Sequence, residues 1–105
     1  MKLTFSERVV EAAQSIPSGK VTTYGDLARA CGSGGQAARS VNGILLRAHN
    51  GGNNNIPFHR IVYSNGQVWK DKKITIERAL LYQKEGIEIN KKGYIYDFEF
   101  KRYRF

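Results

Sequence analysis

The sequence is short of cysteine, proline and acidic residues. With Cys31 as its only cysteine it has no internal disulfide, and this composition suits a reducing compartment. No apolar run approaches the roughly 20 residues needed to span a bilayer, and the first residues lack the pattern of a signal peptide. We therefore expect neither a secreted protein stabilised by disulfides nor a protein that crosses a membrane.

The scarcity of acids leaves a large positive charge. Nine Asp and Glu stand against seventeen Lys and Arg, which gives a formal net charge of +8 and a pI near 9.8. This excess creates a positive field that favours polyanions, nucleic acid first and an anionic membrane surface second. The 105 residues, 41% of them hydrophobic, are enough for one domain over 1–105 with its own core. It ends in a basic aromatic tail from about residue 88 to residue 105.

Capping residues predict the first two helices. Thr4 followed three residues later by Glu7 forms a capping box, and the apolar spacing behind it extends an amphipathic helix over about residues 4–16. Thr23 with Asp26 at the third position starts a second, shorter helix in the same way.

Glycines mark where the next helices begin and end. The glycine-rich turn at residues 32–35 separates the second helix from a longer third helix over about residues 36–48. A short helix, a glycine turn and a longer helix together give the outline of a helix-turn-helix. Further along, hydrophobic spacing predicts a fourth helix over residues 75–85, with Gly86 just after its end.

Two strand patterns follow the third helix. Residues 61–63 and 67–69 flank the tight-turn sequence SNG at 64–66, which is typical of a β hairpin. After a helix-turn-helix such a hairpin is a wing. The expected fold class is therefore mainly α with a small β hairpin, a winged helix-turn-helix. In the tail, aromatic and other residues alternate over 94–101, which predicts a half-buried strand.

The third helix has an outer face that is small, polar and basic. Apolar residues cluster on one side at about 100° per residue, and Arg39, Gly43 and Arg47 project from the other side, with Gln36 and Ser40 beside them. Neither the helix nor the loop after it contains an acid. Small residues allow another surface to come close and basic ones suit phosphate, but a solvated helix face gives the same pattern.

Four segments in this order resemble one known family. They are VTTYGDLA at 21–28, AARSV at 37–41, IPFHRIV at 56–62 and SNG at 64–66. Together they are similar to the DNA-binding domain of the O6-alkylguanine-DNA alkyltransferases, over about residues 5–88. In those repair enzymes a cysteine between the proline and the histidine of the third segment takes the alkyl group, and here that position is Phe58. The chain therefore resembles the alkyltransferase-like proteins, which keep the DNA-binding architecture without that cysteine.

The resemblance implies roles for individual residues. Arg39 corresponds to the arginine that enters the base stack in place of the extruded nucleotide, and Tyr24 to the tyrosine that helps to rotate this nucleotide out. The residues implied to bind DNA are Tyr24, Gln36, Ala37, Arg39, Ser40, Asn42 and Arg47. The residues implied to line the lesion pocket are Tyr24, Phe58, Ile61, Val68, Trp69 and Lys70. His59 and Glu85 correspond to the family's thiol-activating relay, and we expect them to remain as a structural hydrogen-bonded pair.

The chemistry of these residues leads to the same expectation. Removing an alkyl group from an aryl ether oxygen needs a soft anionic nucleophile such as a thiolate, and phenylalanine has no lone pair. Cys31 matches no acceptor position, and at the end of a helix it suits a small buried apolar role. We therefore expect no catalysis, no cofactor and no metal. The rival hypothesis, an alkyltransferase with another nucleophile, predicts a covalent gain in mass.

The expected function is recognition of O6-alkylguanine in double-stranded DNA by base flipping, which flags the lesion for nucleotide excision repair. Repair proteins are partners by resemblance only, and we expect a monomer without a membrane partner. The expected localisation of the protein is cytoplasmic and nucleoid-associated in a prokaryote, or nuclear in a eukaryote. The alternative is a winged-helix transcription regulator, which would prefer a DNA sequence and ignore alkylation. The basic residues at 70–73 would face either the modified purine or the flanking phosphates.

Overall fold

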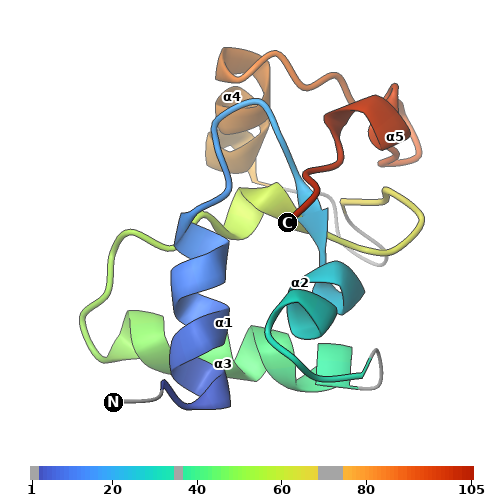
Figure 1. The fold of residues 1–105 in the computed structure, drawn as a ribbon. Helices are drawn as coiled ribbons and strands as arrows, with labels where there is room; N and C mark the ends of the chain where they lie inside the picture. The colour runs from blue at the N-terminus through green and yellow to red at the C-terminus, as the bar shows by residue number, and fades with distance from the viewer. Residues whose placement is uncertain (1–2, 35–36, 69–74) are drawn as a thin grey trace.

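Three helices pack against one another in the computed structural model, which describes residues 3–34, 37–68 and 75–105 (Figure 1). They are α1 (Phe5–Gln14), α2 (Tyr24–Ala30) and α3 (Ala38–Asn50). Both predicted caps are confirmed. Thr4 and Glu7 form the reciprocal capping box of α1, and the Thr23 hydroxyl accepts the Asp26 amide at the start of α2.

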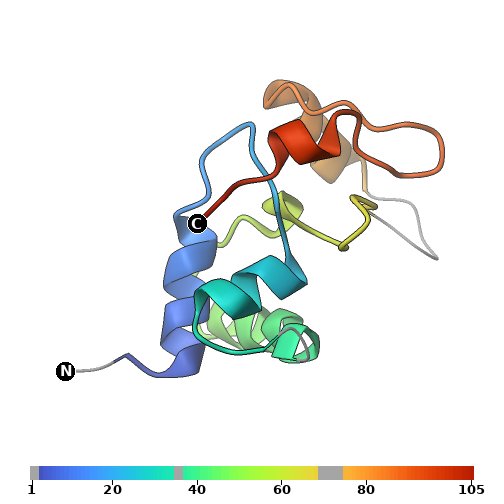
Figure 2. The same cartoon turned by 45° about the vertical axis from the view of Figure 1, so that its right-hand side comes forward.

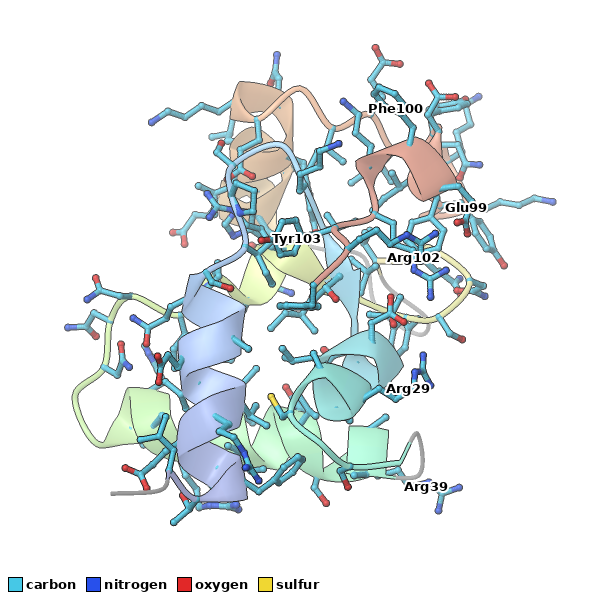
Figure 3. The ribbon with its side chains drawn as sticks, viewed as in Figure 1. Arg29, Arg39, Glu99, Phe100, Arg102 and Tyr103 are labelled. Carbon is cyan, nitrogen blue, oxygen red and sulfur yellow. The ribbon has the colours of Figure 1, made fainter. Side chains whose placement is uncertain are left out.

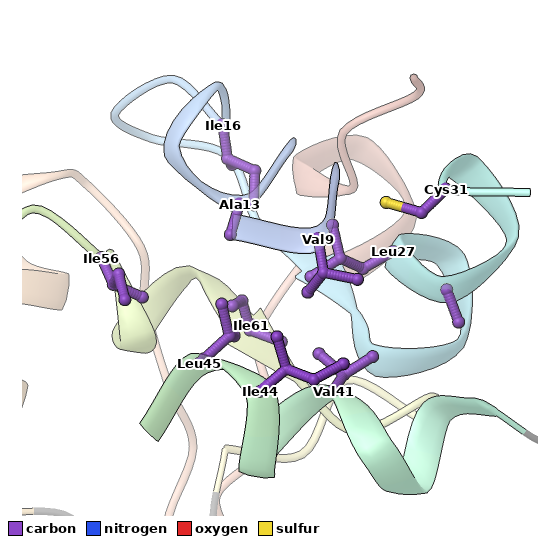
Figure 4. Close-up of a cluster of buried hydrophobic side chains, with 11 residues drawn as sticks. Val9, Ala13, Ile16, Leu27, Cys31, Val41, Ile44, Leu45, Ile56 and Ile61 are labelled. Atoms are coloured by element: carbon purple, nitrogen blue, oxygen red, sulfur yellow. The ribbon is translucent and has the colours of Figure 1, made fainter. Parts of the chain in front are cut away.

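The main core lies between these helices (Figure 4). It is formed by the buried side chains of Val9, Ala13, Ile16, Leu27, Ala28, Cys31, Val41, Ile44, Leu45, Ile56 and Ile61. Each helix contributes residues three or four positions apart, because these positions share one face of a helix. Cys31 caps the C-terminus of α2 inside this core, as the sequence predicts, and burial raises the pKa of its thiol.

The small sheet pairs in a different way from the predicted hairpin. Strand β1 (Thr22–Thr23) pairs in parallel with β2 (Ile61–Val62), with Thr22 opposite Ile61. The predicted turn at 64–66 is present, since the Tyr63 amide donates to the Gln67 carbonyl at 3.1 Å. Gln67 then bridges to Tyr94 instead of continuing a ladder with β2. The prediction is therefore wrong about the strand that pairs with residues 61–62. The turn fixes only local geometry, and β2 pairs with β1, which is far away in the sequence.

The fourth helix forms where expected but buries little of its apolar surface. Helix α4 (Ile76–Lys84) begins after the Thr75 cap and is followed by Gly86 at φ 74°. Ile76 is 81% exposed, whereas Tyr82 is buried. Tyr82 belongs to a second cluster with Val21, Val62, Ile87 and Ile95. Among the described residues, no helix is both long and apolar enough to cross a membrane.

The C-terminal segment forms a short helix where the alternating pattern predicted a strand. The segment begins with a turn at 90–93, in which the Asn90 side chain accepts the Lys92 and Tyr94 amides. Asp97 then adopts a left-handed conformation (φ 55°), and α5 (Phe98–Lys101) follows. The strand prediction is wrong because the aromatic side chains do not share one buried face. Phe98 packs on the second cluster, whereas Phe100 is 75% exposed.

Candidate nucleic-acid interface

The outer face of α3 is polar and basic, as the sequence predicts. Arg39, Ser40, Asn42 and Arg47 are exposed, and Figure 3 shows Arg39 pointing away from the body of the molecule. Ala37 precedes the helix and is half-buried, while Gln36 lies outside the described residues.

The two arginines of α3 differ from most others in their electrostatic partners. Within the part of the chain that the structure describes, ion pairs join acids to Arg29, Arg60, Arg102 and Arg104. Arg39 and Arg47 have no such pair among these residues. No acid of the described residues therefore neutralises their charge, which leaves it available to an anionic ligand.

Tyr24 stands at the first position of α2, where the helix-turn-helix begins. It is half-buried, packs against the main core and lies 5.9 Å from the Tyr63 ring, centroid to centroid. Burial raises the pKa of the Tyr24 hydroxyl, so it remains protonated and able to donate at neutral pH. The sequence pattern predicts Tyr63 in a strand and gives no signal that it pairs with Tyr24.

Phe58 opens a short 3-10 helix, η2 (Phe58–Arg60), directly after Pro57. It is half-buried, and the His49 ring meets it edge-on with centroids 5.8 Å apart. A pocket of about 220 Å³ lies beside it. The described residues that line this pocket are Ile56, Phe58, His59, Thr75, Glu77, Arg78 and Leu81.

The other residues expected to line a lesion pocket lie elsewhere. Ile61 is buried in the main core, and Val68 packs on the second cluster. Trp69 and Lys70 lie outside the described residues. The pocket instead joins Phe58 to the first turns of α4, which sequence reasoning missed. Its Arg78 side chain is near enough to lower the pKa of Tyr24, against the larger effect of burial.

The predicted pair of His59 and Glu85 is confirmed, with His59 Nε2 2.6 Å from Glu85 Oε2. The carboxylate also accepts bonds from Arg60 at 2.8–3.2 Å and from the Gly19 amide at 3.1 Å. Arg60 in turn donates to the Ile16 carbonyl at 2.8 Å. These bonds tie the end of α1, η2 and the end of α4 together, and Arg60 and Gly19 were not predicted members.

Burial opposes ionisation of Glu85, whose side chain is only 6% exposed. The bonds from Arg60, His59 and Gly19 outweigh burial and hold the pKa of Glu85 at about 2. The carboxylate is therefore ionised at neutral pH. The His59 ring is further fixed by an edge-on contact with Tyr82, with centroids 5.8 Å apart. Across the described residues, no three His, Cys, Asp or Glu side chains are grouped to hold a metal ion.

Helix α2, the turn that follows it at 31–32 and the basic outer face of α3 define a helix-turn-helix of the DNA-binding class. Residues 4–87 match the model of the family described as "6-O-methylguanine DNA methyltransferase, DNA binding domain". The chain belongs to this family, and within it to the alkyltransferase-like proteins.

Relatives from bacteria and yeast support this assignment. The chain is 35% identical over 101 residues to the DNA base-flipping protein of Escherichia coli K12, covering 96% of this chain and 74% of that one. It is 33% identical over 87 residues to alkyltransferase-like protein 1 of Schizosaccharomyces pombe, covering 81% and 78%. A crystal structure of S. pombe Atl1 with damaged DNA containing O6-carboxymethylguanine matches with a TM-score of 0.77 at 27% identity, covering 99% of both chains.

Proposed function

We propose that this protein recognises O6-alkylguanine in duplex DNA by flipping the damaged base out of the helix, and that it performs no chemistry on it. The observation that carries this proposal is the pairing of His59 with Glu85 directly after Phe58. The residues that would activate a nucleophile keep their contact, but the residue next to them has no nucleophilic atom.

Cys31 offers no substitute for the missing nucleophile. It is buried in the main core at the end of α2, and burial raises the pKa of its thiol. A reactive cysteine needs the opposite, an accessible thiol with a lowered pKa. The proposal of a binding protein without catalysis follows from Phe58 and Cys31 together.

Binding would use the outer face of α3 in the minor groove. Arg39 would fill the space left by the extruded nucleotide, and Arg47 would neutralise phosphate. Tyr24 would stand beside the rotated nucleotide and steady it. The small Ala37 and Ser40 suit close approach of the helix to DNA. Both arginines are exposed and have no acid partner within the described part of the chain, which supports these roles.

Selectivity would come from two sources. An alkyl group at O6 weakens base pairing, so a damaged guanine costs less free energy to extrude than a normal one. The extruded base would then meet the aromatic Phe58 and the pocket between η2 and α4. We further propose that the bound complex marks the lesion for nucleotide excision repair proteins. This role requires binding to the lesion and no chemistry on it.

The test is a binding titration on two duplexes that differ only in one O6-methylguanine. The proposal expects tighter binding to the damaged duplex. Equal affinities, or a preference set by the surrounding sequence, would instead favour a transcription regulator.

A second experiment tests the absence of chemistry. The intact mass of the protein is measured after incubation with the damaged duplex and should not change. A gain of one methyl group on any residue would refute the non-catalytic part of the proposal.

A further inference from the structure

The C-terminal segment, residues 93–103, lies beyond the part of the chain that matches the methyltransferase domain model, which ends at residue 87. It nevertheless has a counterpart in the S. pombe structure, whose match covers 99% of this chain. Figures 1 and 2 show α5 beside the stretch that leads from α1 to α2, at the end of the molecule away from α3. The segment is thus near the start of the helix-turn-helix but not on its outer helix.

Backbone hydrogen bonds hold this segment against the residue before β1. The Val21 amide donates to the Lys101 carbonyl at 3.0 Å, and the Tyr103 amide donates to the Val21 carbonyl at 2.7 Å. Tyr103 also packs against the main core. Because Tyr24 is three residues after Val21, the segment fixes the chain just ahead of α2.

A side-chain clamp then holds the first turn of α2 itself. Arg102 Nε donates to Asp26 Oδ2 at 2.6 Å, and Arg102 Nη2 donates to Asp26 Oδ1 at 2.8 Å. The two side chains are 19% and 15% exposed, so solvent screens this two-bond contact only partly. Asp26 is two residues after Tyr24. Helix α2 has only seven residues, and a helix this short depends on tertiary contacts for its position.

The same segment packs against the turn that follows Tyr63. The Ile95 amide donates to the Gly66 carbonyl at 3.0 Å. The Phe98 ring covers Gly66 so closely that a Cβ there would lie 2.7 Å from Phe98 Cγ. The segment therefore contacts the chain shortly after each member of the Tyr24 and Tyr63 pair, at Asp26 and at Gly66.

We infer that the C-terminal segment is a positioning element for base flipping, with Arg102 as the residue that sets Tyr24 through Asp26. Arg102 acts through another residue and need not touch DNA, since Asp26 and Glu99 already accept its bonds. This inference rests on the proposed function, because it assigns to the segment the placement of the tyrosine that would steady the flipped nucleotide.

The test compares Arg102→Ala with Arg104→Ala on damaged and undamaged duplexes. Arg104 carries the same charge directly after the segment, and its recorded bond within the described residues is to the exposed Glu99, so its loss should leave the ratio of the two affinities unchanged. Arg102→Ala should lower affinity for the damaged duplex about fivefold, a usual size for coupling through a positioning contact, with undamaged binding unchanged. A 2-aminopurine beside the lesion should also give less fluorescence at saturating protein, because fewer nucleotides are flipped.

Further variants separate positioning from stability. Thermal unfolding is measured for every protein, and Arg102→Lys, which keeps the charge but not the two-bond geometry, should recover only part of the selectivity. Asp26 also accepts a bond from Arg29 at 2.8 Å, so the informative comparison is Arg102→Ala in an Asp26→Ala background, where the change should cost no further selectivity if Arg102 acts through Asp26.

Three outcomes overturn the inference or its basis, and each is distinct. Equal losses on both duplexes would make Arg102 a phosphate contact. Unchanged selectivity in folded Arg102→Ala would leave the segment without a positioning role. If the unaltered protein itself binds both duplexes equally, the proposed function fails, whatever the variants do.

Discussion

Phe58 stands beside a histidine whose orientation is fixed on two sides, by Glu85 through Nε2 and by the Tyr82 ring. Residue 58 therefore has as its neighbour in the chain a histidine whose imidazole is already aligned. In this arrangement the nature of residue 58 decides whether the neighbouring groups support chemistry or only structure.

Phe58→Cys tests whether the relay still functions. We expect the new thiol to have a pKa below the unperturbed ~8.5, because His59 next to it favours the thiolate. The measurement is the pH dependence of thiol alkylation in a Cys31→Ala background. Adding His59→Phe should move the titration back toward the unperturbed value. If Phe58→Cys already titrates there, His59 has only a structural role.

Arg39→Ala tests the arginine of α3 that points outward (Figure 3). It should weaken binding to the damaged duplex by about 1–3 kcal/mol, since the gap left by the flipped nucleotide stays unfilled. The melting temperature should not change, because Arg39 is exposed and lies opposite the core side of α3. Arg8→Ala, which removes an exposed charge from α1, is the matched control. A lower melting temperature with intact binding would instead make Arg39 structural.

At the scale of elements, those with local signals were predicted from the sequence. Thr4 and Thr23 each cap a helix through the amide three residues on, and such bonds depend only on neighbours in the chain. The outer face of α3 was also predictable, because helical periodicity assigns residues to its two sides.

Elements that depend on distant partners were not predicted. Strand β2 pairs with β1, and no local pattern in residues 61–69 reveals this. The tail turns helical at Phe98–Lys101 although its alternation is typical of a strand, and directly after this helix it pairs with the distant Val21 through Lys101 and Tyr103. The residues of the candidate site divide in the same way, into those with a local signal and those that depend on distant packing. The sequence identified Phe58, His59 and Glu85, but Arg78 enters the pocket wall only because α4 packs beside η2.

Glu85 joins three elements, and its ionisation should appear in the stability of the fold. Its pKa is lowered from 4.5 to about 2, so it contributes on the order of 3 kcal/mol to the free energy of unfolding above pH 4.5. That contribution is lost as the pH falls from 4.5 toward 2, where the folded protein also takes up the proton.

Glu85→Gln should therefore be less stable than the unaltered protein at pH 7, by on the order of 3 kcal/mol. The difference should narrow steadily below pH 4.5. Urea unfolding at several pH values measures both effects, and Glu11→Gln, at an exposed position of α1, should show neither. A difference that stays constant down to pH 2 would mean that packing, and not the charge of Glu85, explains the loss.

At the scale of the whole molecule, the positive charge is divided between structure and surface. Arg60 and Arg102 are bound to carboxylates and help to hold the fold together. Arg39 and Arg47 have no acid partner among the described residues and lie on one exposed helix face. The net charge of +8 attracts any DNA, whereas discrimination would depend on the pocket and on flipping.

Salt should separate these two contributions. Raising the salt concentration from about 50 to about 200 mM should lower the affinity for damaged and undamaged duplexes by a similar large factor. The reason is that binding to either duplex releases counterions from the same phosphates. The ratio of the two affinities should stay nearly constant, since extrusion of the base and its fit beside Phe58 involve no change in the number of neutralised phosphates. Arg47→Ala should reduce the slope of log affinity against log salt by about 1 on both duplexes. A ratio that collapses as salt rises would show that the preference for the lesion is itself electrostatic, and the pocket would then not be its source.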